Sequence, residues 1–313
     1  MPHNVPLLIA NNFHQDTVEK LSSSFDATLF WTLNEPQQEE LVVSRRGEIR
    51  AVATASWATN PLIYKLPNLE IIACFGVGVD GIDFDITRPR GIKVTNTPTV
   101  LNDAVADIAI SLILATQRNL INADRFVRDN SWADGPFPFG KGLAGKTLGI
   151  LGLGEIGEEI AERAKTFKLK IAYHNRSPKN LPYDYYSSAA DLAAHSDILL
   201  SMLPGGTETH HLINADIFDN LGSEGTFINV GRGSTVDELA LIAALQQGKI
   251  ASAGLDVYEC EPDVPDQLKL MKNVVLFPHI GSATVETRRA MGNLVIDNLL
   301  AWQSKLPLLT PVD

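Results

Sequence analysis

Short apolar segments alternate with polar or amphipathic stretches along the chain, and this alternation predicts its secondary structure. In the first hundred residues, the apolar segments with the length of strands are Leu7–Ala10, Ala27–Phe30, Ala51–Thr54, Ile71–Cys74 and Lys93–Thr95. Between them lie mixed segments with the length of helices, such as Asp16–Ser22 and Glu35–Ser44. A repeated order of strand, helix and strand predicts a parallel sheet with helices on both faces.

The same alternation returns in the second half of the chain, after a break at Asn96–Pro98. A long apolar helix is predicted over Ala104–Gln117, and a loop rich in glycine, proline and aromatic residues over Ser131–Gly145. The strands predicted after this loop are Thr147–Leu151, Lys170–His174, Ile198–Met202, Phe227–Val230, Ser252–Asp256 and Val274–Pro278. We therefore predict an α/β fold with two doubly wound parallel-sheet domains.

The last predicted helix, Glu286–Trp302, is amphipathic and follows the segment that ends the second sheet. We expect this helix to pack on the first domain, so that the chain crosses between the domains near Pro98 and near Ala283. The first domain, which is flavodoxin-like, then comprises residues 1–98 and 285–313, and a Rossmann domain comprises residues 99–284. Two crossings predict a hinge and a cleft between the domains, which is a common place for ligands.

Composition and charge exclude several classes of protein. Apolar residues make up 45% of the 313 residues and charged residues 20%, as in an ordinary globular protein. The formal net charge of −11 argues against nucleic acid and anionic membranes as partners, and no apolar run is long enough to span a bilayer. Two cysteines cannot form a disulfide framework, and Leu7–Ala10 is interpreted as a strand and not as part of a signal peptide. A cytoplasmic location is expected.

A glycine pattern follows the predicted strand Thr147–Leu151 and precedes a helix over Glu158–Phe167. Gly152 permits a tight turn, Gly154 lets the backbone approach a pyrophosphate, and Gly157 allows close packing of helix and strand. The helix N-terminus adds free N–H groups and partial positive charge. In this context the pattern predicts a dinucleotide-binding site, and it assigns that role to residues 99–284.

The end of the next strand indicates which dinucleotide is bound. An acidic residue at that point would bind the ribose 2′-hydroxyl of NAD, but this chain has Asn175, Arg176 and Ser177. An arginine pairs with a 2′-phosphate, and Asn and Ser side chains donate hydrogen bonds to it. The alternative is a solvated arginine in a turn. We predict that the protein binds NADP and prefers NADPH to NADH.

Three chemically distinctive segments follow strands of the second domain. Arg232 stands between glycines, and an arginine there can bind a carboxylate and stabilise an oxygen on which negative charge develops. His279 follows a proline and is the kind of side chain that donates a proton at neutral pH. A carboxylate beside it would favour the protonated ring, and both Glu259 and Glu261 are candidates. Taken singly, each residue has a structural interpretation as a turn or surface residue.

The other histidines carry weaker signals. His210 and His211 are adjacent, so we expect them to point in different directions and to lie at the surface. No metal site is predicted.

The chain resembles the D-isomer-specific 2-hydroxyacid dehydrogenases over essentially its whole length. The segments that carry this resemblance are Gly76–Asp80, Gly152–Gly157, Asn229–Gly233, Gly254–Pro262 and Pro278–Ser282. Within that family the chain is most similar to the NADPH-dependent hydroxypyruvate, glyoxylate and hydroxyphenylpyruvate reductases. The resemblance implies reduction of small 2-keto acids, such as glyoxylate or hydroxypyruvate, to D-2-hydroxy acids such as glycolate or D-glycerate. It also implies a homodimer, with the helix near Ala104–Gln117 in the interface.

The resemblance also implies roles for individual residues. Arg232 would bind the substrate, His279 would be the general acid, and Glu261 would be its partner, so the resemblance selects Glu261 over Glu259. Backbone amides of Val77 and Gly78 would hold the substrate carboxylate. The implied cofactor-binding residues are Gly152, Leu153, Gly154, Glu155, Ile156, Gly157, Asn175, Arg176, Ser177, Leu203, Pro204, Val230, Gly231, Asp256, His279 and Gly281.

Two questions stay open at this point. The identity of the keto acid is one, because Ser56 and Trp57 follow a strand and either line the substrate site or pack in the core. The other is whether the chain is an enzyme or a binding protein that senses NAD(P)H, as co-repressors of the same fold do. A third possibility, a formate or phosphite dehydrogenase, would need additional substrate arginines that the sequence does not show.

Overall fold

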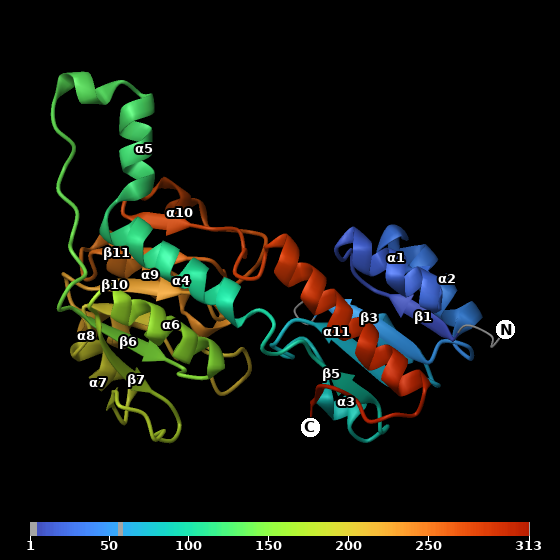
Figure 1. Ribbon diagram of the computed structural model, residues 1–313. Coiled ribbons are helices and arrows are strands. Elements are labelled where there is room, and N and C mark those ends of the chain that lie inside the picture. The colour runs from blue at the N-terminus through green and yellow to red at the C-terminus, as the bar shows by residue number, and fades with distance from the viewer. Residues whose placement is uncertain (1–4, 56–58, 313) are drawn as a thin grey trace. The chain divides into compact units, whose positions relative to one another are not determined.

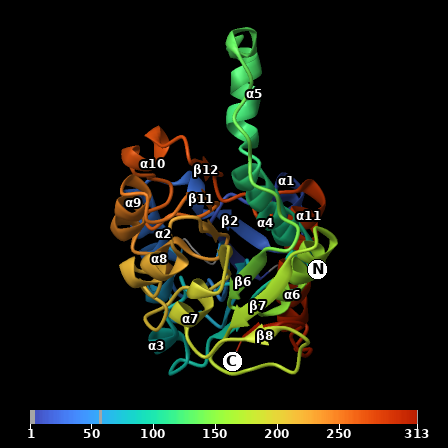
Figure 2. The same cartoon turned by 90° about the vertical axis from the view of Figure 1, so that its left-hand side faces the viewer.

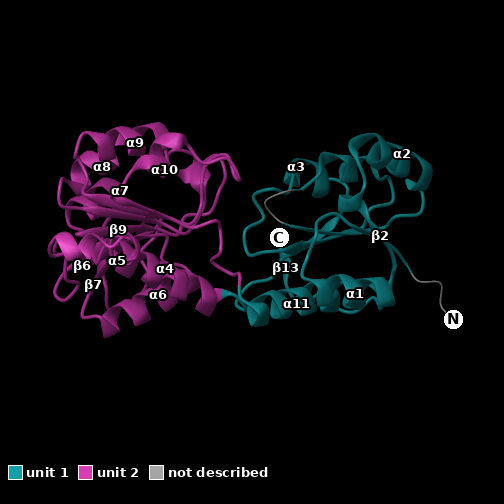
Figure 3. Cartoon of the chain, turned by 90° about the horizontal axis from the view of Figure 1, so that it is seen from above, with its two compact units in different colours: residues 1–101, 284–313 teal, residues 102–283 magenta. Residues whose placement is uncertain are grey.

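The computed structural model describes residues 5–55 and 59–312, so Ser56 and Trp57 lie outside the described residues. The chain divides into two compact units, shown separately coloured in Figure 3. Unit 1 comprises residues 1–101 and 284–313, and unit 2 comprises residues 102–283. The domain boundaries expected from the sequence were 98/99 and 284/285. No single helix among the described residues is both long and apolar enough to cross a membrane. The helices α4 (Asn102–Gln117) and α5 (Leu120–Arg128) pass that test only together, as a pair bent by 60°.

Unit 1 contains a six-stranded sheet in the order β13-β5-β4-β3-β1-β2. All neighbouring strands are parallel except the last strand of the chain, β13, which runs antiparallel to β5. Every residue of β3 and β4 is buried, as expected for central strands covered on both faces. The strands are β1 (Pro6–Ile9), β2 (Asp26–Leu29), β3 (Ala51–Ala55), β4 (Ile71–Phe75), β5 (Lys93–Thr95) and β13 (Pro311–Val312). The helices are α1 (Gln15–Ser24), α2 (Glu35–Arg45), α3 (Phe84–Thr87) and α11 (Val285–Gln303), with short 3-10 turns η1 (Phe30–Thr32) and η2 (Pro61–Lys65).

The final helix, α11, packs on α1 and β4, and Figure 3 shows α1 and α11 side by side. The two helices approach closely at Gly292, where a Cβ would lie 1.9 Å from Thr17 Oγ1. Near the end of α11, the buried Asn298 accepts hydrogen bonds from the N–H groups of Leu309 and Thr310 at 3.0 and 3.1 Å. These bonds position the tail so that β13 pairs with β5. The expectation that the last helix packs on the first domain is confirmed.

Unit 2 contains a seven-stranded parallel sheet in the order β12-β11-β10-β9-β6-β7-β8. The chain starts at the centre of this sheet, extends it through β7 and β8, and then returns to the other side of β6 with β9. The switch in direction lies between β6 and β9, and ligands of such sheets bind at the carboxyl ends beside the switch. The strands are β6 (Thr147–Leu151), β7 (Lys170–His174), β8 (Asp184–Tyr185), β9 (Ile198–Ser201), β10 (Thr226–Asn229), β11 (Ser252–Leu255) and β12 (Val274–Leu276).

Helices cover both faces of this sheet, with α4 and α6 on one side and α7, α8 and α9 on the other (Figure 3). Two large apolar clusters, one on each side, form the core of unit 2. The helices are α4 (Asn102–Gln117), α5 (Leu120–Arg128), α6 (Glu155–Thr166), α7 (Ala189–Ala194), α8 (Ala215–Leu221), α9 (Glu238–Gln246) and α10 (Asp266–Leu270), with 3-10 turns η3 (Ser131–Asp134) and η4 (Gly233–Thr235). The two doubly wound sheets confirm the predicted fold class.

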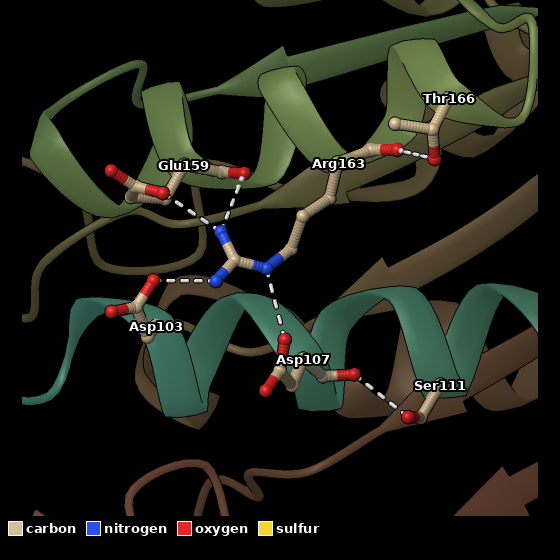
Figure 4. Close-up of polar contacts among 6 residues, drawn as sticks. All are labelled: Asp103, Asp107, Ser111, Glu159, Arg163 and Thr166. Atoms are coloured by element: carbon tan, nitrogen blue, oxygen red, sulfur yellow. Dashed lines mark hydrogen bonds and ion pairs between the residues drawn. The ribbon is translucent and has the colours of Figure 1, made fainter.

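Arg163 joins α4 to α6, the helix that follows the glycine pattern (Figure 4). Its guanidinium binds Asp103 and Asp107 on α4 and Glu159 one turn earlier on its own helix. A single arginine with three carboxylates fixes the relative position of the two helices better than separate exposed ion pairs would. Arg163, in the last turn of α6, therefore holds this helix against α4.

α5 is an element that the sequence pattern did not predict. It projects away from the rest of unit 2, together with η3 and the loop that returns to β6 (Figures 1 and 2). None of its residues is buried, and large apolar side chains on it and on η3 are exposed: Leu120, Ile121, Val127 and Trp132.

Candidate active site

The glycine turn after β6 has the geometry that a dinucleotide-binding turn requires. Gly152 has φ +89°, and a Cβ there would lie 3.0 Å from the carbonyl oxygen of Met202, just after β9. A Cβ on Gly157 would lie 3.0 Å from the Gly152 oxygen, whereas a Cβ on Gly154 would meet nothing within 4 Å. The turn is thus closely packed on the protein side and open at Gly154. The residues fit a bound pyrophosphate, which would lie against this open backbone at the N-terminus of α6.

Asn175, at the end of β7, braces the glycine turn. Its Oδ1 accepts a hydrogen bond from the N–H of Leu153 at 2.7 Å, and its Nδ2 donates to the Leu153 carbonyl oxygen at 3.1 Å. The second of these contacts uses one of the two hydrogens on Nδ2, and the predicted donation from Asn175 to a 2′-phosphate stays a prediction.

Arg176, the next residue, extends into solvent with 92% of its side chain exposed. Its guanidinium lies 3.3 Å from the carboxylate of Glu208, in the loop after β9. An exposed ion pair of this kind contributes little stability, so the arginine is available to a stronger anionic partner. A doubly charged 2′-phosphate is such a partner.

Three neighbouring strands bring the predicted catalytic residues to one edge of the sheet. β10, β11 and β12 are adjacent and parallel, so their carboxyl ends lie together. Arg232 follows β10, Glu261 lies in the segment after β11, and His279 follows β12. The prediction placed these residues at strand ends of one sheet, and the structure does bring them together.

His279 and Glu261 form a short hydrogen bond, with Nδ1 of the ring 2.6 Å from Oε2 of the carboxylate. The other carboxylate oxygen accepts a hydrogen bond from the N–H of Tyr258 at 3.1 Å. Burial by itself raises the pKa of Glu261, but the hydrogen bond from His279 and the charges of His279 and Arg232 outweigh it and lower that pKa. Glu261 is therefore ionised at neutral pH, and its contact fixes the hydrogen of a neutral His279 ring on Nδ1.

Asp256, which is buried, holds the segment that carries His279. Its two carboxylate oxygens accept hydrogen bonds from the N–H groups of Ile280 and Gly281, both at 2.8 Å. The N–H of His279 donates to the Asp256 carbonyl oxygen, also at 2.8 Å, while His279 itself has φ +53°. Burial raises the pKa of Asp256, although the two N–H donors and the charge of His279 lower it in part. The predicted contact of Asp256 with the cofactor stays a prediction.

The glycines beside Arg232 are required by close contacts within the protein. A Cβ on Gly233 would lie 1.9 Å from the backbone of Tyr258, and a Cβ on Gly231 would lie 2.6 Å from the Leu203 carbonyl oxygen. The segment around Arg232 is therefore pressed between the loops that follow β9 and β11. This packing places Arg232 near enough to Glu261 for its charge to lower the pKa of that carboxyl group.

Glu259, the alternative carboxylate, has a different partner. Its Oε1 lies 2.6 Å from Nε2 of His211, so that a second histidine–glutamate pair stands two residues along the same segment. The expectation that His210 and His211 point in different directions is wrong, because their rings stack with centroids 3.9 Å apart. The cause is the backbone of His211, whose φ of +50° reverses the direction that an extended or helical chain would give it.

Glu238 is a residue of this region that the sequence analysis missed. It is the first residue of α9, it is buried, and its Oε1 accepts a hydrogen bond from the N–H of Glu259 at 3.0 Å. Burial and the charges of Glu259 and Glu261 raise its pKa, while the hydrogen bond lowers it. Acidic residues are common in the first turn of a helix, where most of them are solvated. The sequence therefore gave no signal that Glu238 is buried beside Glu259.

In unit 1, the predicted substrate contacts Val77 and Gly78 follow β4 and are half-buried. The side chain of Asn96 donates a hydrogen bond to the Val77 carbonyl oxygen at 2.8 Å, and Thr97 Oγ1 accepts one from the Gly76 N–H at 2.9 Å. These two hydrogen bonds hold the turn after β4 in place within unit 1. The contact of Val77 and Gly78 with substrate stays a prediction.

Comparisons with known proteins agree with this geometry. Residues 110–281 match the family model of the D-isomer specific 2-hydroxyacid dehydrogenase, NAD binding domain. The chain is 47% identical over 296 residues to glyoxylate/hydroxypyruvate reductase A of Arabidopsis thaliana, and 46% identical over 297 residues to hydroxyphenylpyruvate reductase of Plectranthus scutellarioides. Each of these alignments covers 94% of both proteins.

Among solved structures, the chain resembles the NADPH-dependent glyoxylate/hydroxypyruvate reductase of Sinorhizobium meliloti, crystallised with NADP and malonate. The TM-score is 0.91 at 42% identity, covering 99% of this chain and 97% of that one. The motifs, the sheet topology and these similarities agree, and the chain belongs to the D-isomer-specific 2-hydroxyacid dehydrogenase family.

Proposed function

We propose that this protein reduces small 2-keto acids, such as glyoxylate or hydroxypyruvate, to D-2-hydroxy acids with NADPH. The observation that carries the proposal is the grouping of the 2.6 Å His279–Glu261 hydrogen bond with the charge of Arg232 at the carboxyl edge of the nucleotide-binding sheet. Names of relatives support the substrate class, since they include glyoxylate/hydroxypyruvate, hydroxyphenylpyruvate and 2-ketogluconate reductases.

His279 supplies the proton in this proposal. Glu261 is ionised and bonded to Nδ1, so it stabilises the charged imidazolium and directs Nε2–H to the keto oxygen. As the carbonyl carbon receives a hydride, its oxygen takes that proton, and the ring becomes neutral imidazole. Arg232, whose charge already acts on Glu261, binds the substrate carboxylate and stabilises the oxygen as its charge grows. Val77 and Gly78 amides of unit 1 are the proposed second contact of that carboxylate.

The cofactor, when bound, supplies the hydride. The open backbone at Gly154 and the N-terminus of α6 would hold its pyrophosphate, and Arg176 would bind a 2′-phosphate. Ser177 is the proposed further donor to that phosphate, while Asn175 keeps the glycine turn in place. No acidic residue ends β7, which favours NADPH over NADH.

The test is a spectrophotometric screen of NADPH oxidation with glyoxylate, hydroxypyruvate, phenylpyruvates and 2-ketogluconate. We expect turnover with at least one of them, and a kcat/KM for NADPH above that for NADH. Arg176→Ala should weaken NADPH use far more than NADH use, and an NADH preference in the wild-type protein would contradict the cofactor assignment. Tight NADPH binding without oxidation by any keto acid would instead favour a dinucleotide-sensing binding protein.

We further propose that the protein is a homodimer. α4 buries most of its apolar side chains within unit 2, whereas α5 and η3 expose theirs on a projection (Figure 2). A second copy of the chain is the occupant proposed for that apolar surface. Light scattering after gel filtration tests it, with Val127→Asp and Trp132→Asp expected to yield monomers; a monomeric wild-type protein would refute the proposal.

A further inference from the structure

His210, His211 and Glu259 form a second cluster of ligand-type side chains, distinct from the His279–Glu261 pair. One donor atom from each residue lies within 4.8 Å of the other two. Within residues 5–55 and 59–312, it is the one group of three or more His, Cys, Asp or Glu side chains with such spacing. We propose that this cluster binds a divalent transition-metal ion of the Zn²⁺ class. The proposal does not depend on the function proposed above.

The hydrogen bond made by His210 leaves its Nε2 with a lone pair that a metal ion can use. Its Nδ1 lies 3.1 Å from the carbonyl oxygen of Ser234, and a carbonyl only accepts, so Nδ1 carries the hydrogen. The lone pair is therefore on Nε2. Histidines that bind metals almost always donate their other ring N–H to a carbonyl or carboxylate, which fixes the tautomer and the orientation of the ring. His210 has this arrangement before any metal binds.

His211 and Glu259 supply the other two ligands. They are joined at present by the 2.6 Å contact between His211 Nε2 and Glu259 Oε1. Zinc bonds to nitrogen and oxygen of about 2.0–2.2 Å in a tetrahedral site place neighbouring ligand atoms roughly 3.3 Å apart. The pair has to open by less than about 1 Å. The metal then replaces the hydrogen that the two atoms share, and the neutral ring carries its hydrogen on Nδ1.

The backbone around the cluster brings the two imidazoles together, and from their stacked arrangement the rings have to turn so that both ligand nitrogens face one ion. The left-handed conformation of His211 places the two rings on the same side, and the His211 N–H is bonded to the Ser234 oxygen at 3.0 Å. On the segment after β11, the N–H of Glu259 donates a hydrogen bond to the Glu238 carboxylate at 3.0 Å. A non-glycine residue at positive φ costs free energy and is often retained where a side chain must point to a site.

Two imidazoles and one carboxylate match a known donor set for zinc, with water completing the fourth position. Imidazole also suits Cu²⁺ and Ni²⁺, whereas Mg²⁺ and Ca²⁺ prefer oxygen ligands alone. A bound ion would cross-link the loop after β9 to the loop after β11, and so it would stabilise unit 2 without taking part in keto-acid reduction.

The test is calorimetric titration of chelator-treated protein with ZnCl₂, together with thermal unfolding in the presence and absence of the ion. We expect one ion per chain and a rise in Tm that EDTA reverses. His210→Asn and Glu259→Gln should each weaken binding by about 10-fold or more, because loss of an outer partner alone commonly costs that much. Co²⁺ should give visible absorption typical of a four-coordinate site, and both variants should lose it.

Two controls make the result specific. His195→Gln removes another exposed histidine whose Nδ1 also contacts a backbone oxygen, that of Asp191 at 2.8 Å, and this variant should bind zinc as the wild-type protein does. Cys260→Ser removes the exposed thiol next to Glu259 and should also bind normally. Absence of zinc binding by the wild-type protein would overturn the proposal, and so would binding that survives in His210→Asn and Glu259→Gln. His210→Asn keeps the test valid even where substitution at His211 disturbs folding, since His210 is exposed.

Discussion

Two histidine–glutamate pairs take their glutamates from the same segment after β11, and they differ in their surroundings more than in their own geometry. Both have a nitrogen–oxygen distance of 2.6 Å, and all four side chains are partly exposed. In one pair Glu261 binds Nδ1 of His279, beside Arg232 and the anchored Asp256. In the other, Glu259 binds Nε2 of His211, beside a second imidazole. A short hydrogen bond therefore does not by itself identify a general acid.

The difference lies in which ring nitrogen each carboxylate binds and in what surrounds the pair. Because Glu261 binds Nδ1 of His279, the proton to be donated is the one on Nε2, and the charge of Arg232 helps to keep Glu261 ionised. Glu259 binds Nε2 of His211, the nitrogen that would hold a metal, and a second ring stacks on the first. The first environment suits proton transfer to an anion, and the second suits a cation.

The largest effect is expected from exchanging the histidines of the two pairs for glutamine one at a time. His279→Gln should lower kcat by about 10²–10⁴-fold with little change in NADPH affinity, since a general acid contributes on that scale. His211→Gln should leave kcat near the wild-type value. Steady-state kinetics with glyoxylate and fluorescence titration of NADPH measure the two effects. Near-normal turnover of His279→Gln would refute its role as proton donor.

A smaller effect is expected from the two glutamates. Glu261→Gln should lower kcat by about 10²-fold, below the roughly 10⁴-fold loss that a serine-protease triad shows when its carboxylate becomes an amide. Glu259→Gln should retain most of the activity, because its partner takes no part in proton transfer. Equal losses of kcat in the two variants would mean that the pairs are not functionally distinct.

Asp256→Asn tests the anchoring of the His279 segment. The amide replaces one acceptor oxygen by a donor, so that either the Ile280 or the Gly281 N–H loses its partner. A lost hydrogen bond to a charged group destabilises a protein by about 1.5–3 kcal/mol. Urea unfolding at neutral pH measures this change, and a parallel fall in kcat/KM is expected. A wild-type free energy of unfolding would show that the segment is held by other contacts.

The smallest effect concerns how the free energy of unfolding depends on pH, to which Glu261 and Asp256 contribute with opposite signs. The lowered pKa of Glu261 stabilises the folded state above its reference value of 4.5, and this contribution is lost as pH falls through the lowered pKa. The raised pKa of Asp256 affects stability in the opposite direction. Ionisation of this buried carboxyl group lowers the free energy of unfolding, and protonation restores it. As pH falls from neutral towards 3.8, the wild-type protein should gain stability relative to Asp256→Asn.

The same pH series should therefore give slopes of opposite sign. Relative to Glu261→Gln, the wild-type protein should keep a constant advantage above pH 4.5 and lose it below that value. Urea unfolding of both variants and the wild-type protein at each pH measures the two differences. Slopes of the same sign would contradict the assigned environments.

Much of the fold follows from the apolar pattern, because buried parallel strands consist of short uninterrupted apolar runs. The predicted Lys93–Thr95, Thr147–Leu151 and Lys170–His174 coincide with β5, β6 and β7. Several elements were not predicted in this way, and β13 and α5 show two different reasons. β13 has two residues and forms only because α11 and Asn298 bring the tail to β5. α5 is amphipathic in sequence, but it is short and none of its residues is buried within the described part of unit 2, so it belongs to no core that the apolar pattern could predict.

The order of strands along the chain is also sufficient to predict that Arg232 and His279 lie at one edge of the sheet. The choice between Glu259 and Glu261 was beyond the pattern, since both follow the same strand and only the path of the loop decides which carboxylate reaches His279. The orientation of His210 and His211 depended on one backbone angle, at His211, for which the sequence holds no glycine or asparagine signal. Loop conformation, and not residue type, was the missing information.

Unit 1 is assembled from the two ends of the chain, and this affects the order of events during translation. Unit 2 is one continuous stretch, so it is complete before Thr284 is synthesised. The first five strands are made much earlier, yet the helix that covers β4 and α1 and the strand that pairs with β5 are synthesised only after the whole of unit 2. Domains fold as units as soon as their residues are available. The first segment of unit 1, residues 1–101, therefore has an uncovered apolar face until α11 is synthesised, and a chaperone can bind this face during that interval.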